Sequence, residues 1–185
     1  MTIHEIAELL VEEQIHFKID EEKSTCFVTC SGLDNYHNKE GEKRLLIAVN
    51  LHEEGEYLNI YAPFAFKVPQ DKAAVFNTAC GIIQWNTKLV QFEYDKKDGE
   101  VRPVIEFPLE DGVVTGKQLK RCIDGMSSIL DKYYFALKTV IDTGEIKGLD
   151  KEEINTDQLE RIQSILGQLP PEMLQELMNR MKGRM

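Results

Sequence analysis

One apolar stripe constrains the fold of this chain more than any other feature of its sequence. Between positions 119 and 140 the apolar residues recur at alternating spacings of four and three, as Leu119, Ile123, Met126, Leu130, Tyr133, Leu137 and Val140. This spacing predicts one helix of about 26 residues, roughly 39 Å long at a rise of ~1.5 Å per residue. Such a stripe either covers a sheet within its own chain or meets a second copy in a dimer. Leu119, Ile123, Met126 and Leu130 are therefore the first candidates for a partner or dimer interface.

The sequence before this helix changes to a period of two, which is typical of half-buried strands. Strands are expected over 15–19, 24–30, 45–51, 57–62, 89–94 and 101–109, and several are joined by short turns such as Asp98-Gly99. Pro103 and Pro108 remove backbone donors, so we expect the last of these strands to lie at an edge or to end early. Successive strands with short connections favour antiparallel pairing.

Two further helices precede the long one. Thr2 and Glu5 have the spacing of a capping box at the start of the first. Val68-Pro69 opens the second, for which we expect a buried stripe of Ala74, Val75, Ala79, Ile82, Ile83 and Trp85. The sequence therefore predicts an α+β fold in which an antiparallel sheet is sandwiched by helices.

Glycines divide the chain after the long helix. Gly144 and Gly148 break the pattern, and the remainder is typical of two short amphipathic helices, the second lined by Leu174, Leu177, Met178 and Met181. We expect an α+β domain over 1–144 and a C-terminal helical hairpin over 149–185, packed either on its own chain or on another. Methionine side chains adapt to differing partners, so these four residues are also candidates for an interface.

Charge and cysteine content narrow the range of partners. The chain carries 22 basic against 32 acidic residues, a formal net charge of −10. Such a surface repels phosphate backbones, so no nucleic-acid partner is expected. The N-terminus lacks the pattern of a signal peptide, no window is apolar enough to span a bilayer, and the four cysteines contain no Cys-x-x-Cys pair. These features predict a cytoplasmic protein without a membrane partner.

No pattern of catalytic residues is found. The stretch from Gly112 to Lys117 has one residue too few between its glycines for a phosphate-binding loop, and a glutamine follows the lysine. Cys26 and Cys30 would share one face of a strand, but packing explains buried cysteines more simply than metal binding does. We expect no enzyme, no cofactor and no metal; a hydrolase would require two carboxylates that meet in a deep pocket.

Beside these patterns, the chain resembles the YbjN family of bacterial sensory-transduction-regulator-like proteins. The resemblance covers about residues 1–144 and is most specific over 68–142. It rests on Val68-Pro69, the helix end from Ile82 to Asn86, Phe92-Glu93-Tyr94-Asp95, Asp98-Gly99-Glu100-Val101-Arg102, Pro108-Leu109 and Leu130-Asp131-Lys132-Tyr133-Tyr134. It implies a fold like that of class I type III secretion chaperones, α+β proteins that commonly dimerise and bind extended segments of client proteins. It supplies no catalytic residues, and the segment from Leu149 lies outside the family pattern.

These observations lead to one functional hypothesis and one alternative. The chain is predicted to be a non-enzymatic protein-binding module, chaperone-like or regulatory, that binds a partner polypeptide by strand addition or through apolar pockets. A homodimer through the long helix is compatible with this hypothesis. The alternative is a sensory protein that binds a small ligand or a metal near Cys26, Cys30 and His16.

Overall fold

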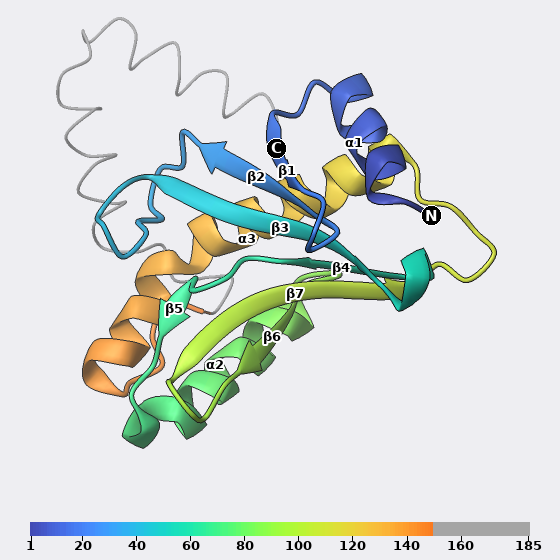
Figure 1. Ribbon diagram of the computed structural model, residues 1–185. Coiled ribbons are helices and arrows are strands. Elements are labelled where there is room, and N and C mark those ends of the chain that lie inside the picture. The colour runs from blue at the N-terminus through green and yellow to red at the C-terminus, as the bar shows by residue number, and fades with distance from the viewer. Residues whose placement is uncertain (150–185) are drawn as a thin grey trace, which may run out of the picture. The chain divides into compact units, whose positions relative to one another are not determined.

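Antiparallel pairing runs through the whole sheet of the computed structural model, which describes residues 1–149 (Figure 1). The strands lie in the order β1-β2-β3-β4-β7-β5, and β6 also pairs with β7. They are β1 (Phe17–Asp20), β2 (Thr25–Ser31), β3 (Arg44–His52), β4 (Tyr57–Tyr61), β5 (Phe66–Lys67), β6 (Gln91–Tyr94) and β7 (Glu100–Pro108). The helices are α1 (Ile3–Glu12), α2 (Ala73–Asn86) and α3 (Gly116–Thr143), with short 3-10 turns at Glu53–Gly55 and Gln70–Lys72.

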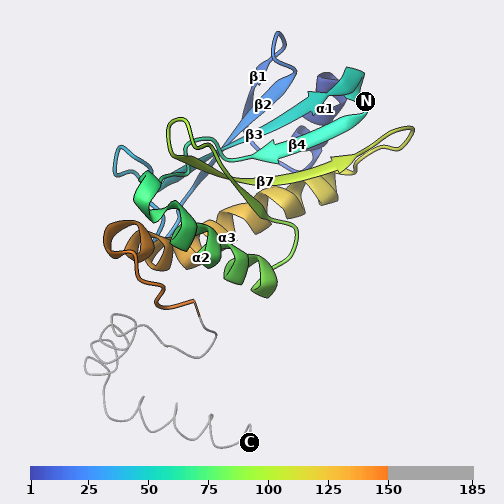
Figure 2. The ribbon, with the colours of Figure 1, turned by 90° about the horizontal axis from the view of Figure 1, so that it is seen from below.

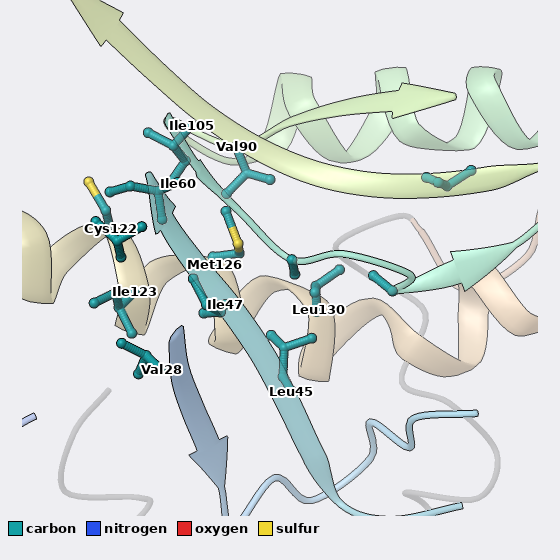
Figure 3. Close-up of a cluster of buried hydrophobic side chains, with 14 of the residues drawn as sticks. Val28, Leu45, Ile47, Ile60, Val90, Ile105, Cys122, Ile123, Met126 and Leu130 are labelled. Atoms are coloured by element: carbon teal, nitrogen blue, oxygen red, sulfur yellow. The ribbon is translucent and has the colours of Figure 1, made fainter. Parts of the chain in front are cut away.

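The long helix α3 runs along one face of the sheet, and both α1 and α2 pack against it (Figure 2). Side chains of alternate strand residues, including Val28, Ile47 and Ile60, point at Ile123 and Met126 of α3 (Figure 3). The seven apolar positions of the predicted stripe are all buried. The predicted α+β class and the antiparallel sheet are therefore confirmed. α3 packs on the sheet because each of them has one apolar face.

The ends of the helices follow the sequence signals. Thr2 with Glu5 and Thr115 with Gln118 form capping boxes at the starts of α1 and α3. Gly144 adopts a left-handed conformation, with φ of 77°, and ends α3. These local rules fix where the elements begin and end before any tertiary contact is considered.

Pro103 and Pro108 were expected to place their strand at an edge or to end it early; the edge position is wrong, whereas the strand does end at Pro108. β7 pairs with β4, β5 and β6 and lies inside the sheet. Along one side of β7, pairing passes from β5 at residues 100–101 to β4 at residues 104–108. Pro103 falls between these two partners and still accepts a hydrogen bond from the Ala62 amide at 3.1 Å, while Pro108 is the last residue of the strand. The missing donors therefore disrupt little of the ladder.

The predicted buried stripe of α2 is partly wrong. The buried residues are Phe76, Ala79, Cys80 and Ile83, whereas Trp85 is 89% exposed and Ala74 is also exposed. Two positions along a helix correspond to a rotation of about 200°, so Ile83 and Trp85 point to nearly opposite sides. The buried face of α2 is the one on which Phe76, Ala79, Cys80 and Ile83 follow one another at spacings of three and four.

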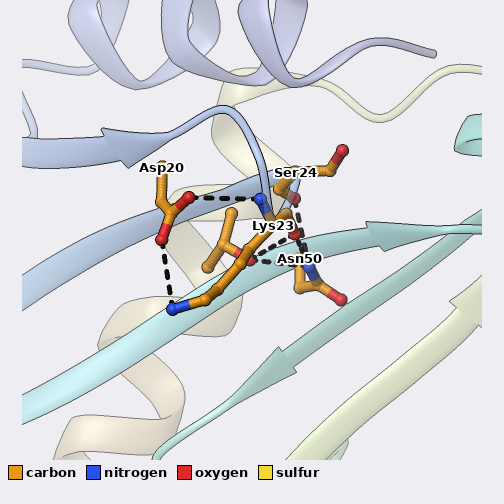
Figure 4. A network of polar contacts seen from close by, with 5 residues as sticks. Asp20, Lys23, Ser24 and Asn50 are labelled. Carbon is orange, nitrogen blue, oxygen red and sulfur yellow. Dashed lines mark hydrogen bonds and ion pairs between the residues drawn. The ribbon is translucent and has the colours of Figure 1, made fainter.

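The turn between β1 and β2 is closed by a polar network that β3 supplies (Figure 4). Asn50 Nδ2 donates to the carbonyl of Lys23 at 2.7 Å, to the carbonyl of Ser24 at 3.1 Å and to Thr25 Oγ1 at 2.6 Å. Asp20 accepts from the Lys23 amide and pairs with its ammonium group. This network stabilises the register of the first three strands on the face away from the helices.

The predicted C-terminal helical hairpin, with Leu174, Leu177, Met178 and Met181, lies outside the described residues. Among residues 1–149, no helix combines the length and the apolar character that crossing a bilayer requires.

Candidate functional site

A groove beside the exposed Phe64 is the main cavity that we consider as a binding site. We call it the Phe64 groove; its volume is about 420 Å³. Four segments that are distant in the sequence line it, through His37, Asn38, Lys39, Phe64, Ala65, Phe66, Lys67, Asp98, Glu100, Tyr134, Lys138 and Ile141. They are the loop before β3, the turn before β5 with β5 itself, the β6–β7 turn, and the C-terminal half of α3.

Asp131 of α3 holds the loop that carries His37 and Lys39. Its carboxylate accepts hydrogen bonds from the backbone amides of Asp34 at 3.2 Å, Asn35 at 2.8 Å and Tyr36 at 2.8 Å. One side chain thereby fixes three consecutive backbone donors that a polar loop would otherwise leave to water. The loop is thus anchored to the helix and not only to its two flanking strands.

Tyr36 links this loop to the turn before β5. Its ring is buried, and its hydroxyl donates to the carbonyl of Ala65 at 3.2 Å. Burial raises the pKa of Tyr36 to about 12, with a smaller contribution from Tyr134. The phenol therefore remains a neutral donor throughout the physiological pH range.

Phe64 is held in a strained backbone conformation with its ring in solvent. Its φ is 52°, a region that residues with a side chain adopt at a cost of roughly 1–2 kcal/mol. Its amide donates to Glu100 Oε1 at 2.9 Å, and its side chain is 62% exposed. The backbone at Phe64 is therefore strained, although its aromatic ring adds little to the core. Such local strain at an exposed side chain is typical of binding sites.

The Phe64 groove has an aromatic floor. Tyr134 lies 5.4 Å from Tyr36, 6.2 Å from Phe66 and 5.7 Å from His37, measured between ring centroids. The three pairs are edge-on, stacked and tilted, respectively, and edge-on and offset-stacked contacts are the arrangements that aromatic rings prefer. An apolar side chain that entered the groove would meet rings that are already ordered.

Charged side chains surround this floor. Three lysines, Lys39, Lys67 and Lys138, lie among the lining residues with two carboxylates, Asp98 and Glu100. The ammonium group of Lys39 lies 5.9 Å from the centroid of the Phe64 ring. Lys39 already pairs with Glu40 at 3.6 Å and Lys138 with Asp142 at 3.3 Å, so the rim of the groove carries mixed charge without an excess of cations.

The predicted interface residues of α3 lie in the core. Leu119, Ile123, Met126 and Leu130 are buried between α3 and the sheet. Of the two uses predicted for this stripe, covering the sheet is the one seen in the chain. A second copy could meet these four side chains only if α3 were to leave the sheet.

The residues of the predicted sensory site do not assemble into a metal centre. Cys26 is fully buried, and burial raises the pKa of its thiol to about 11. Burial likewise raises the pKa of Cys30, while His16 is exposed just before β1. Within residues 1–149, no three side chains of His, Cys, Asp or Glu come close enough to hold an ion.

The Phe64 groove was not predicted from the sequence. One signal was present, because the run Ala62-Pro63-Phe64-Ala65 places an aromatic ring in a turn after a strand that ends at Tyr61. Nothing in the sequence indicated that Asp131 and Tyr134, about 70 positions later, would lie beside it.

Comparison with known proteins shows a likeness of fold. No protein-family model matches the chain, and no curated protein matches it. Among solved structures, YbjN from E. coli aligns with a TM-score of 0.53 and 11% sequence identity, over 73% of this chain and 92% of that one. The fold is thus similar to that of YbjN, as the sequence resemblance implied.

Two other solved structures align less closely. They are the HopA1–SchA chaperone–effector complex, with a TM-score of 0.43 and 12% identity over 65% of this chain and 83% of that one, and the ExsC–ExsE complex, with a TM-score of 0.48 and 16% identity over 74% and 97%. At these identities, similarity concerns the arrangement of the backbone and not the activity.

Proposed function

We propose that this protein is a non-enzymatic protein-binding module, chaperone-like or regulatory, that binds an extended segment of a partner polypeptide in the Phe64 groove. The observation that carries the proposal is the strained and exposed Phe64 above an ordered aromatic floor. An aromatic anchor beside a preformed pocket is the usual centre of a binding hot spot. We place this function in the cytoplasm, where the chain's free thiols would persist.

The strands next to the groove offer a backbone to an extended partner. β4 pairs with β3 only as far as Ala48, opposite Tyr61, so residues 44–47 of β3 pair with β2 alone. Leu46 lies in this half of β3 and is exposed. A peptide that adds to this edge could place one of its side chains near Phe64, which supports binding by strand addition.

The partner can be found by photo-crosslinking. A photoreactive phenylalanine analogue replaces Phe64 in the full chain, and the crosslinked protein is identified by mass spectrometry. A chain with the same analogue at Val113, which is 74% exposed and lies outside the groove, is the matched control. A segment that crosslinks from position 64 and not from 113 is then synthesised.

The affinity of the synthetic segment decides whether the groove binds it. Phe64→Gly removes the ring and also relieves the positive φ, so this variant should fold at least as well as the wild type. We expect it to weaken binding by at least tenfold, since truncating a hot-spot aromatic costs about 2 kcal/mol or more. Equal affinities of wild type and Phe64→Gly, or an equal loss of affinity in Phe64→Gly and in the control Val113→Gly, would refute the proposal.

A small anionic ligand is the second candidate for the same groove. Its volume lies within the range of small-molecule sites, about 300–1,000 Å³. Of its three lining lysines, Lys67 is the one that forms no ion pair within residues 1–149 and could meet an anion. If this alternative holds, at least one compound in a thermal-shift screen of small aromatic carboxylates should raise the melting temperature of the wild type and not that of Phe64→Gly. A polypeptide segment that binds while every small acid fails would exclude it.

A further inference from the structure

The face of the sheet away from the helices carries a second cluster of polar and aromatic side chains. Tyr57, Asn59 and Tyr61 alternate along β4 and point to this face, since Leu58 and Ile60 between them belong to the core. Glu106 of β7 lies directly opposite Asn59 in the register. We call these four residues the β4 face cluster.

Glu106 is a positioned carboxylate without a cation. It accepts a hydrogen bond from Asn59 Nδ2 at 2.9 Å. Partial burial, and after it the negative charge of Glu106, raise the pKa of Tyr57. Within residues 1–149 Glu106 forms no ion pair, and the nearby Arg102 is bound to Glu93 at 2.6 Å.

Asn59 supplies the second, independent observation. The residue is only 7% exposed, and its Oδ1 atom has no hydrogen-bond partner among the described residues. The neighbouring Asn50, opposite it on β3, bonds through its amide to the β1–β2 turn (Figure 4). Buried polar atoms are nearly always paired, so an unpaired acceptor beside a carboxylate indicates that a donor is still to be supplied.

The two acceptors and the two rings define the chemistry of that donor. A guanidinium group is planar, always charged, and able to donate to two acceptors while it lies on an aromatic ring. The same arrangement already exists at one ring of the cluster, where the Arg102 guanidinium carbon lies 5.0 Å from the centroid of Tyr61 while its Nε donates to Glu93. A net charge of −10 also favours approach of a basic segment.

We infer that the β4 face cluster binds an arginine side chain of a partner polypeptide, with the guanidinium donating to Glu106 and Asn59 Oδ1 beside the tyrosine rings. This inference rests on the proposed protein-binding function and adds the chemistry of the partner. The cluster lies on the face of the sheet opposite the core residues Leu58 and Ile60. Oδ1 of Asn59 is itself buried, so binding requires the side chains that cover it to move.

The test uses a defined probe and the full-length chain. A capped five-residue peptide with one central arginine flanked by glycine and serine is titrated into ¹⁵N-labelled protein, and amide shifts are followed by NMR. We expect binding on the order of millimolar, weaker at higher salt, with shifts confined to residues 57–61 and 104–107. The same peptide with citrulline, which keeps the shape and loses the charge, should cause none of these shifts.

Matched variants separate charge from fold. Glu106→Gln keeps the acceptor for Asn59 and removes the negative charge, so we expect roughly tenfold weaker binding with an unchanged spectrum elsewhere. Glu12→Gln removes the same charge from the exposed side of α1 and should leave the affinity unchanged. Tyr61→Leu should weaken binding several-fold through loss of the ring.

The outcomes distinguish this site from the Phe64 groove. Phe64→Gly should bind the arginine peptide as the wild type does, even though it loses the partner segment. Equal binding of the citrulline peptide, shifts that map to the groove, or no effect of Glu106→Gln would each overturn the inference and leave the proposed function standing.

Discussion

Asp131 offers the sharpest test of how the groove is built. Its carboxylate Oδ1 accepts from the partly buried amides of Asn35 and Tyr36, and Oδ2 accepts from the exposed amide of Asp34. Replacing Asp131 with alanine leaves all three donors without a partner. Of these three amides, only the exposed amide of Asp34 can bond to water instead without a loss of stability.

The expected loss follows from the two partly buried donors. An unsatisfied buried donor costs about 1–3 kcal/mol, and partial access of water reduces this figure here. We therefore expect Asp131→Ala to lower the free energy of unfolding by about 2–3 kcal/mol. Asp131→Asn keeps one carbonyl oxygen for Asn35 and Tyr36, so its loss should be nearer ~1 kcal/mol.

Urea unfolding measures these differences as shifts in midpoint at constant slope. Asp142→Ala is the matched control, because Asp142 is exposed on the same helix and its one ion pair within residues 1–149 is with Lys138, at 3.3 Å. Its loss should not exceed ~0.5 kcal/mol. Hydrogen exchange at the Tyr36 amide should accelerate in Asp131→Ala. If Asp131→Ala costs no more than Asp142→Ala and this amide stays protected, Asp131 does not anchor the loop.

Three further predictions concern the core, the thiols and the single tryptophan. Met126→Ala should lower the free energy of unfolding in urea by about 2–5 kcal/mol, because Met126 is fully buried under the sheet. Val113→Ala, at an exposed position, should change this free energy by no more than ~0.5 kcal/mol. Similar losses in the two variants would contradict the described core. Burial raises the pKa of Cys26 to about 11 and of Cys80 to about 12, from ordinary values of 9.0, so the stabilisation from neutral thiols is present below pH 9.0 and is lost as the pH rises toward 11. Thiolate absorbance in the folded protein at pH 9.0 would contradict this, and urea-unfolded chain serves as the positive control. Trp85 should emit like free tryptophan in water and be fully quenched by acrylamide; a blue-shifted emission that disappears on dilution would instead show that two copies meet at α2.

Local rules in the sequence accounted for the elements and for the side of α3 that is buried. The capping residues Thr2 and Thr115 and the terminal Gly144 act on their own backbone neighbours, so their effect can be predicted without a fold. The stripe from Leu119 to Val140 is equally local, because its period of three and four defines one face of a helix. These features also sufficed to predict an antiparallel α+β protein.

Predictions that depended on neighbours in space were less accurate. Pro103 suggested an edge strand, yet it falls where β5 gives way to β4, and only the pairing of distant strands creates that position. Trp85 was expected on the buried stripe of α2, but the face of the helix set by Phe76 and Ile83 places it in solvent. In each case residue type gave the preference and tertiary packing gave the outcome.

The sequence by itself determined the three helices, most of the strands and the apolar face of α3, because these depend on periodicity and on contacts within a few residues. It indicated neither the short strand β5 nor the buried face of α2. Only the tertiary structure decided that Phe64 would stand beside Tyr134 and that Asn59 would face Glu106. Both arrangements join residues at least 47 positions apart. The register of the sheet and the packing of α3 against it bring these segments together. Neither can be read from a single stretch of the chain, because both depend on contacts between distant residues.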